Sequence, residues 1–164
     1  MKYEEFIAKF NTQVFSIDDD KRLTLAIEVC KNLFFDYVEF SDKYQWGNKE
    51  VLLDAIKILE QFKTQEINIS LVDQTLKKID TITPDMDDFG GRELASYALN
   101  SCVAVYSSLE FLLDKLPKHI YDVGICLTDT IDFKIQENQD LTEEEVDKNP
   151  MMIDARRYLI DKSK

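Results

Sequence analysis

Three closely spaced carboxylates are the side chains of this sequence best suited to hold a metal ion: Asp85, Asp87 and Asp88. Carboxylate oxygens are the ligands that hard divalent cations such as Ca²⁺ and Mg²⁺ prefer. If an EF-hand loop began at Asp85, Gly90 would fall at the required sixth position. Phe89 at the fifth position and Ser96 at the twelfth cannot supply the ligands needed there, so the calcium-loop pattern is not met.

We therefore expect these aspartates to stabilise the beginning of a long helix. Carboxylates interact favourably with the positive end of a helix dipole, and they accept hydrogen bonds from its free amide groups. A metal-dependent enzyme that uses the cluster from Asp85 to Asp88 is the alternative interpretation.

Other catalytic patterns are missing from the sequence. It contains no GxGxxG, P-loop, GxSxG or HExxH motif. The single histidine, His119, limits acid–base catalysis and metal binding, and its place shortly after Pro117 indicates a solvated residue at a helix start. We expect no catalytic residue and no cofactor.

A second set of acids falls in the C-terminal third of the chain. Asp129 and Asp132 are three residues apart on a predicted helix and are therefore neighbours on its polar face. The segment 137–147 contains six acids and no base. These carboxylates could bind cations on a partner, and a simply solvated surface is the alternative. The candidate partner-binding residues are Asp122, Asp129, Asp132, Glu143 and Glu144.

The whole chain is acidic, with 32 acids against 20 bases and a formal net charge of -12. A field of this sign repels phosphate backbones, so we expect no nucleic-acid partner. A basic protein is the partner class that the charge favours. Solubility alone would also explain an acidic surface.

The cysteines and the first residues of the chain indicate a cytoplasmic protein. Cys30, Cys102 and Cys126 form no CxxC pair and no even-numbered framework, so buried free thiols are expected. The first residues lack a signal-peptide pattern. The least charged stretch, residues 94–113, contains too many polar residues for a membrane span, and we expect no membrane partner.

Apolar residues recur at helical spacing along the whole chain, which predicts an all-α fold. Only four glycines and three prolines are present, which disfavours the tight turns of β-sheets. We predict a single bundle-like domain over residues 1–164, with seven or eight helices. Its centre is predicted to be a long helix near residues 89–116, where small residues on several faces allow close packing. The other helices are predicted at 3–14, 19–44, 49–62, 70–82, 118–135 and 150–161, with a capping box at Thr142 and Glu145.

Three passages lie in an order shared with a known family. The first is FDYVEFS at 35–41 followed by WGN at 46–48, similar to a "PNYxLFxE…FGD" passage. The second is PDMDDF at 84–89 followed by YALNSC at 97–102, similar to "DF…AxxAL(D/N)A(A/C)". The third is NPMM at 149–152, similar to "HPLMQ".

Together these passages resemble the YjaG-like bacterial family, a domain of unknown function. This sequence has Asp36 in place of proline, Trp46 in place of phenylalanine and Asn48 in place of aspartate. The resemblance implies a multihelical cytoplasmic protein. It implies no catalytic residues.

These observations favour a non-enzymatic acidic module that binds another protein. An immunity-type inhibitor of a basic toxin enzyme fits the charge, the helical pattern and the missing catalytic motifs, with Trp46 or Tyr121 as aromatic anchors. The alternatives are the metal-dependent enzyme described above and a homodimeric housekeeping protein.

Overall fold

The computed structural model describes residues 1–137 and 139–164. In this part of the chain there are eight α-helices, one 3₁₀-helix and no β-strand, so the predicted all-α fold is confirmed. The elements are α1 (Tyr3–Ser16), α2 (Asp19–Tyr44), α3 (Lys49–Gln61), α4 (Ile69–Ile82), η1 (Met86–Phe89), α5 (Glu93–Asp114), α6 (Pro117–Gln136), α7 (Glu143–Lys148) and α8 (Pro150–Lys162). Asn138, within the acidic segment 137–147, lies outside the described residues.

Short polar side chains set the helix starts. The carboxylate of Asp18 accepts the Lys21 amide at 2.8 Å, and the side chain of Asn149 accepts the Met151 amide at 2.9 Å before Pro150 opens α8. The capping box predicted at Thr142 and Glu145 is present. Each of these contacts satisfies an amide that the helix itself leaves free.

The fourth helix begins at Ile69, one residue before its predicted start at Ser70. Asn68 is its N-cap, and the side-chain oxygen of Asn68 accepts the Leu71 amide at 3.1 Å. Both residue types are good N-caps, and the apolar Ile69 before Ser70 hid the true start from the sequence pattern.

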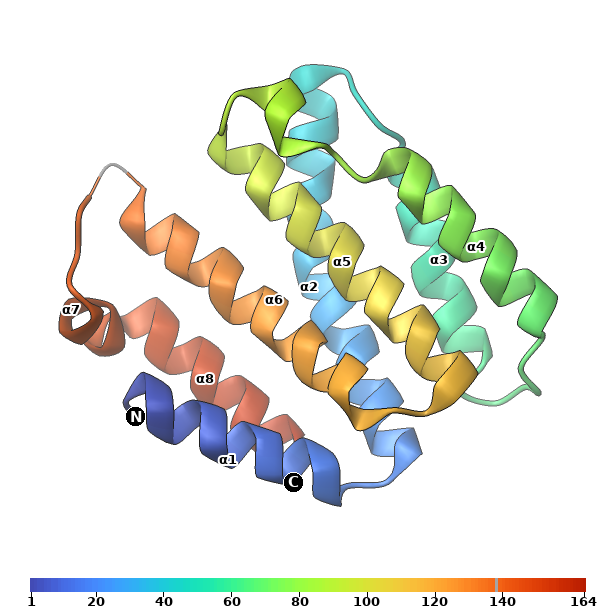
Figure 1. The fold of residues 1–164 in the computed structure, drawn as a ribbon, viewed down its shortest axis with the longest axis horizontal. Helices are drawn as coiled ribbons and strands as arrows, with labels where there is room; N and C mark the ends of the chain where they lie inside the picture. The colour runs from blue at the N-terminus through green and yellow to red at the C-terminus, as the bar shows by residue number, and fades with distance from the viewer. Residues whose placement is uncertain (138) are drawn as a thin grey trace.

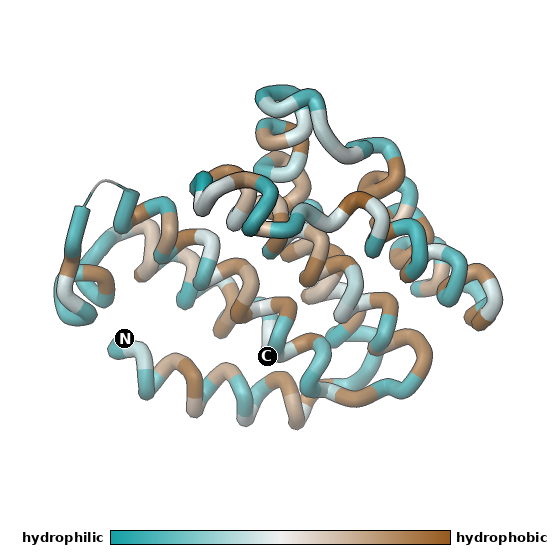
Figure 2. Tube along the Cα trace, turned by 45° about the horizontal axis from the view of Figure 1, so that its top comes forward, coloured by the Kyte–Doolittle hydropathy of each residue, from teal (hydrophilic) through white to brown (hydrophobic). Residues whose placement is uncertain are grey.

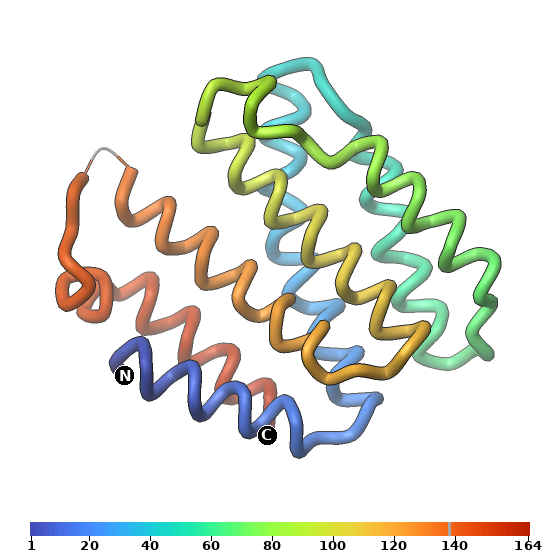
Figure 3. The backbone as a smooth tube through the Cα atoms, viewed as in Figure 1, coloured from blue at the N-terminus to red at the C-terminus, as the bar shows by residue number. Residues whose placement is uncertain are grey.

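Helices α2 and α5 lie at the centre of the bundle (Figure 1). Helices α3 and α4 pack on one side of this pair, and α6, α8 and α1 pack on the other. The smooth trace in Figure 3 follows the chain back from α6 through α7 into α8, which lies beside α1. The two ends of the chain are therefore on the same side of the molecule.

Helix α5 packs against neighbours on several faces because many of its residues are small. Ala95, Ala98 and Ala104 are completely buried. The hydroxyl of Ser101 donates to the Leu33 carbonyl of α2 at 2.6 Å, so this buried polar group is satisfied. Along most helices hydrophobic residues alternate with hydrophilic ones, as expected when one face turns inward (Figure 2).

The predicted central helix is present, with different ends. It starts at Glu93, because Met86–Phe89 form a separate 3₁₀-helix and Gly90 and Gly91 both adopt positive φ angles, which break the helical path. It ends where Lys115 adopts a left-handed conformation. With 22 residues it is shorter than α2, which has 26.

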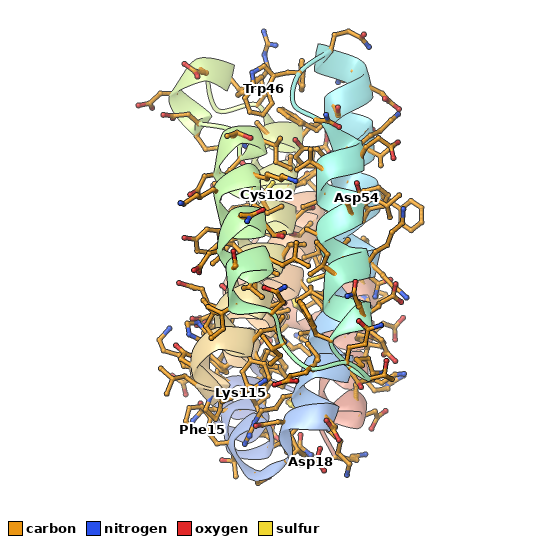
Figure 4. All side chains as sticks on the ribbon, turned by 90° about the vertical axis from the view of Figure 1, so that its right-hand side faces the viewer. Phe15, Asp18, Trp46, Asp54, Cys102 and Lys115 are labelled. Atoms are coloured by element: carbon orange, nitrogen blue, oxygen red, sulfur yellow. The ribbon has the colours of Figure 1, made fainter. Side chains whose placement is uncertain are left out.

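One tyrosine connects three segments at the end of the bundle that carries Trp46 (Figure 4). The hydroxyl of Tyr37 donates to the Ile82 carbonyl at 2.8 Å and accepts the Asn48 amide at 3.2 Å. A Cβ atom at Gly47 would collide with this hydroxyl, so the turn between α2 and α3 requires glycine there. Next to Tyr37, the Phe89 ring lies 5.0 Å from that of Phe40 and 5.4 Å from that of Trp46.

We predict that Tyr37→Phe lowers the free energy of unfolding by about 1–3 kcal/mol, because the Ile82 carbonyl and the Asn48 amide lose their shared partner. Urea denaturation measures the change. Tyr121→Phe, which keeps a half-buried ring against Phe10, is the control and should change stability much less. Equal stability of the Tyr37 variant and the unmodified protein would show that this hydroxyl is not a structural connection.

The three cysteines are free and buried, as predicted. Burial raises the pKa of each of the Cys30, Cys102 and Cys126 thiols to about 12, because the charged thiolate loses its hydration. At neutral pH the native protein therefore holds almost no reactive thiolate.

We predict that a thiol reagent at neutral pH modifies the native protein slowly and modifies three thiols after unfolding. Rapid modification of the native protein would contradict the burial, and so would fewer than three thiols in the unfolded, unreduced chain.

The raised pKa of the thiols also predicts that stability falls as pH rises above 9.0, the ordinary thiol pKa, since the unfolded chain then loses protons that the folded chain retains.

Candidate functional site

Three of the five candidate partner-binding carboxylates meet in one cleft. Asp129 and Asp132 belong to α6, and Glu143 is the first residue of α7. The cleft has a volume of about 340 Å³. We call it the acidic cleft, and its remaining lining residues are Tyr3, Thr128, Gln136, Leu141, Val146, Asp147, Met152 and Arg156.

Helix periodicity explains why α6 presents these acids together. Thr128, Asp129, Asp132 and Gln136 recur at spacings of one, three and four residues and so share one side of the helix. The amide of Gln136 donates to both oxygens of Asp132, at 3.1 and 3.2 Å, which fixes that carboxylate.

A small hydrophobic cluster holds α7 in place beside α6. Ile135, Val146 and Met152 are buried together, and Leu141 packs against them. This cluster is separate from the main core. It connects the end of α6 to α7 and to the start of α8, so three elements form one wall of the acidic cleft.

Arg156 is a buried cation at this cleft, only 3 % exposed. Its Nη1 donates to Asp147 at 2.6 Å and to the Met1 carbonyl at 2.8 Å. Its guanidinium carbon lies 5.8 Å from the ring centre of Tyr3 and 5.7 Å from that of Phe6. Its Nε is buried without a hydrogen-bond partner in the described part of the chain.

The cleft therefore carries an excess of negative charge. Asp147 neutralises Arg156, which leaves Asp129, Asp132 and Glu143 without a basic side chain among the lining residues. Burial of part of Asp129, followed by the nearby charge of Asp132, raises the pKa of the Asp129 carboxyl. A cation placed in the cleft would reverse that effect.

The other two candidate residues lie outside the acidic cleft. Asp122 pairs with Lys118 at 2.5 Å, and Glu144 pairs with Lys148 at 2.6 Å. In both pairs the partners are one helical turn apart, and the lysines are exposed to solvent, where such pairs contribute little. Two of the predicted acids are thus partly neutralised by their own helix.

The aspartates from Asp85 to Asp88 do not stand at the start of α5 as predicted. The side chain of Asp85 accepts the Asp87 amide at 3.0 Å and caps η1 instead. All three carboxylates are exposed. Across residues 1–137 and 139–164, no group of three or more His, Cys, Asp or Glu side chains is placed to hold a metal ion.

The sequence pattern indicated a solvated His119, but the structure places this side chain against two acids. Its Nε2 lies 2.8 Å from Asp114 and its Nδ1 lies 3.5 Å from Glu110, so it connects the end of α5 to the start of α6. The Asp114 carboxylate accepts the Leu116 amide and also contacts His119, and together these contacts lower the pKa of Asp114.

The predicted aromatic anchors are not exposed. Trp46 packs against the rings of Phe40 and Phe89, and Tyr121 packs against Phe10. Both side chains are half-buried. Tyr3 is the aromatic residue of the acidic cleft and is 46 % exposed.

Arg156 is a residue of the acidic cleft that the sequence pattern did not single out. It falls four residues after Met152 and four before Ile160, on the buried stripe of α8, and a charge on such a stripe signals an internal ion pair.

In the part of the chain that the structure describes, no helix is both long enough and apolar enough to cross a membrane.

Comparisons with known proteins identify a family of this fold. A crystal structure of a DUF416 family protein from Shewanella baltica OS155 superposes with a TM-score of 0.80, at 20 % sequence identity, covering 94 % of this chain and 83 % of that one. At this identity the likeness concerns the fold alone. No curated protein matches the chain. Residues 9–159 match the family described as "Protein of unknown function (DUF416)". The chain therefore belongs to the DUF416 family.

Proposed function

We propose that this protein is a non-enzymatic binding module whose acidic cleft receives a basic side chain of a protein partner. The observation that carries the proposal is the convergence of Asp129, Asp132 and Glu143 in one hollow, without a neutralising base among the lining residues. The narrower resemblance to YjaG-like proteins stays a prediction and contributes no residue to this proposal.

The chemistry of the lining favours a guanidinium or an ammonium group. Three carboxylates supply charge-assisted acceptors, and the exposed ring of Tyr3 offers an aromatic face at the edge. Leu141, Val146 and Met152 supply apolar surface for the methylene stem of a long basic side chain. The buried Nε of Arg156 adds a donor for a carbonyl oxygen near the bound cation.

The net charge of -12 suits a partner that is itself basic. A field of this sign attracts a basic enzyme over long range and accelerates the encounter, while the cleft gives the contact a defined position. Among proteins that bind a basic partner, we propose that this one acts as an immunity-type inhibitor of a basic toxin enzyme.

An arginine peptide tests the cleft directly, and we predict that it binds through the three carboxylates. The probe is a capped hexa-arginine peptide, with hexa-glutamine as the uncharged comparison. The triple variant Asp129→Asn, Asp132→Asn, Glu143→Gln should weaken binding at least about tenfold, because hydrogen bonds to charged groups are lost. Calorimetry measures the affinity.

A matched control separates the cleft from the overall charge. The triple variant Asp54→Asn, Asp122→Asn, Glu144→Gln removes three carboxylates outside the cleft, so both variants move the formal net charge from -12 to -9. Affinity of this control should stay close to that of the unmodified protein. Equal weakening in both variants would overturn the cleft as the binding site.

We also predict that association with the peptide slows as salt rises, because exposed charges are screened over about 10 Å at 0.1 M ionic strength. Stopped-flow measurements across a salt series give the association rate. A rate that does not respond to salt would exclude attraction by the protein's charge.

A further inference from the structure

A second cleft is lined by residues from the start of α5, the C-terminal half of α2 and the end of α6. Its volume is about 640 Å³. It shares no residue with the acidic cleft, and the proposed function makes no use of it.

The hydroxyl of Tyr97 is a buried polar group at this cleft that has no partner. Tyr97 is 3 % exposed, and its hydroxyl oxygen forms no hydrogen bond within the described residues. Burial raises the pKa of Tyr97 to about 12, with further contributions from the charges of Glu137, Glu93, Asp36 and Glu39. Tyr97 itself lines the cleft, together with all four of these carboxylates.

The three cations that line the second cleft differ in whether an acid pairs with them. Lys134 is neutralised by the buried Asp36 at 2.5 Å. Lys43 and Arg92 form no salt bridge in the part of the chain described by the structure, and both approach the ring of Tyr44, at 5.7 and 5.1 Å. Two free positive charges therefore meet at one edge of the cleft.

The N-terminus of α5 lies at the same edge. Its N-cap, Arg92, provides no side-chain hydrogen bond, and Glu93 and Leu94 of the first turn line the cleft. The amide of Ala95 in this turn already donates to the Arg92 carbonyl at 3.0 Å. The amides of Glu93 and Leu94, at the first two positions of the helix, have no carbonyl of the helix to bond and favour a negative group. The preceding Gly90 and Gly91 leave the approach open, since a Cβ at either position would meet no atom within 4 Å.

We propose that this second cleft binds a small zwitterion with one carboxylate and one ammonium group, such as a free amino acid. Its carboxylate contacts Arg92, the first amides of α5 and the Tyr97 hydroxyl. Its ammonium group contacts Glu39 and Glu137, which stand unpaired in the described structure. Four carboxylates and three cations line the cleft, so a dianion such as phosphate is disfavoured by the remaining charge.

The test uses free L-amino acids as probes, with acetate and methylammonium as compounds that carry only one of the two charges. Calorimetry on the unmodified protein should show binding of at least one amino acid and no comparable binding of either single-charge compound. Tyr97→Phe should weaken that binding about tenfold, because one hydrogen bond to the ligand is lost. Tyr106→Phe, on the same helix but outside the cleft, should leave the affinity unchanged.

A second measurement reports on the hydroxyl without any ligand. Tyr97→Phe should not lower the thermal midpoint of the free protein, because the hydroxyl has no protein partner to lose. A lower midpoint would mean that the hydroxyl is satisfied in the native protein. That result overturns the proposal, as does an absence of amino-acid binding or an unchanged affinity of the Tyr97 variant.

Discussion

Helix α5 is buried on several faces, and this burial determines how closely its neighbours pack. Two of its neighbours, α2 and α6, can approach closely because alanine and serine occupy the contact positions, including Ala98, Ser101 and Ala104. Two polar side chains of α5 have hydrogen-bond partners on these neighbouring helices. Ser101 donates to the α2 backbone, and Asn100 donates to Thr130 of α6 at 3.0 Å. The position of α6 follows from this packing.

The position of α6 in turn places both candidate sites. Asp129 and Asp132 lie on the side of α6 that faces α7 and α8. There Arg156 donates a hydrogen bond to the Met1 carbonyl, which holds the start of the chain beside the acidic cleft. Another side carries Lys134 to Asp36 of α2, beside the second cleft. A single helix thus separates a site suited to cations from a site whose lining carries both signs of charge.

The helices could be predicted from the sequence because apolar spacing and N-cap residues are local signals. The start of α5 could not, since Gly90 and Gly91 fall inside a run that also fits a helix. The same local signals placed Asp129 beside Asp132. They could not show that Glu143 joins them, because that depends on how α7 packs through Val146 and Met152. The pairing of Asp122 with Lys118 and of Glu144 with Lys148, by contrast, follows from spacing within one helix, so it was a local signal as well.

If the acidic cleft receives a cation, the titration of Asp129 must respond to one. Carboxyl-carbon NMR measures its pKa in the free protein and with saturating butylguanidinium, with the exposed Asp54 as the reference. We predict that the pKa of Asp129 lies above the ordinary value of 3.8 in the free protein and falls when the guanidinium binds. A carboxyl that titrates at its ordinary value, or a pKa that does not respond to the cation, would contradict it.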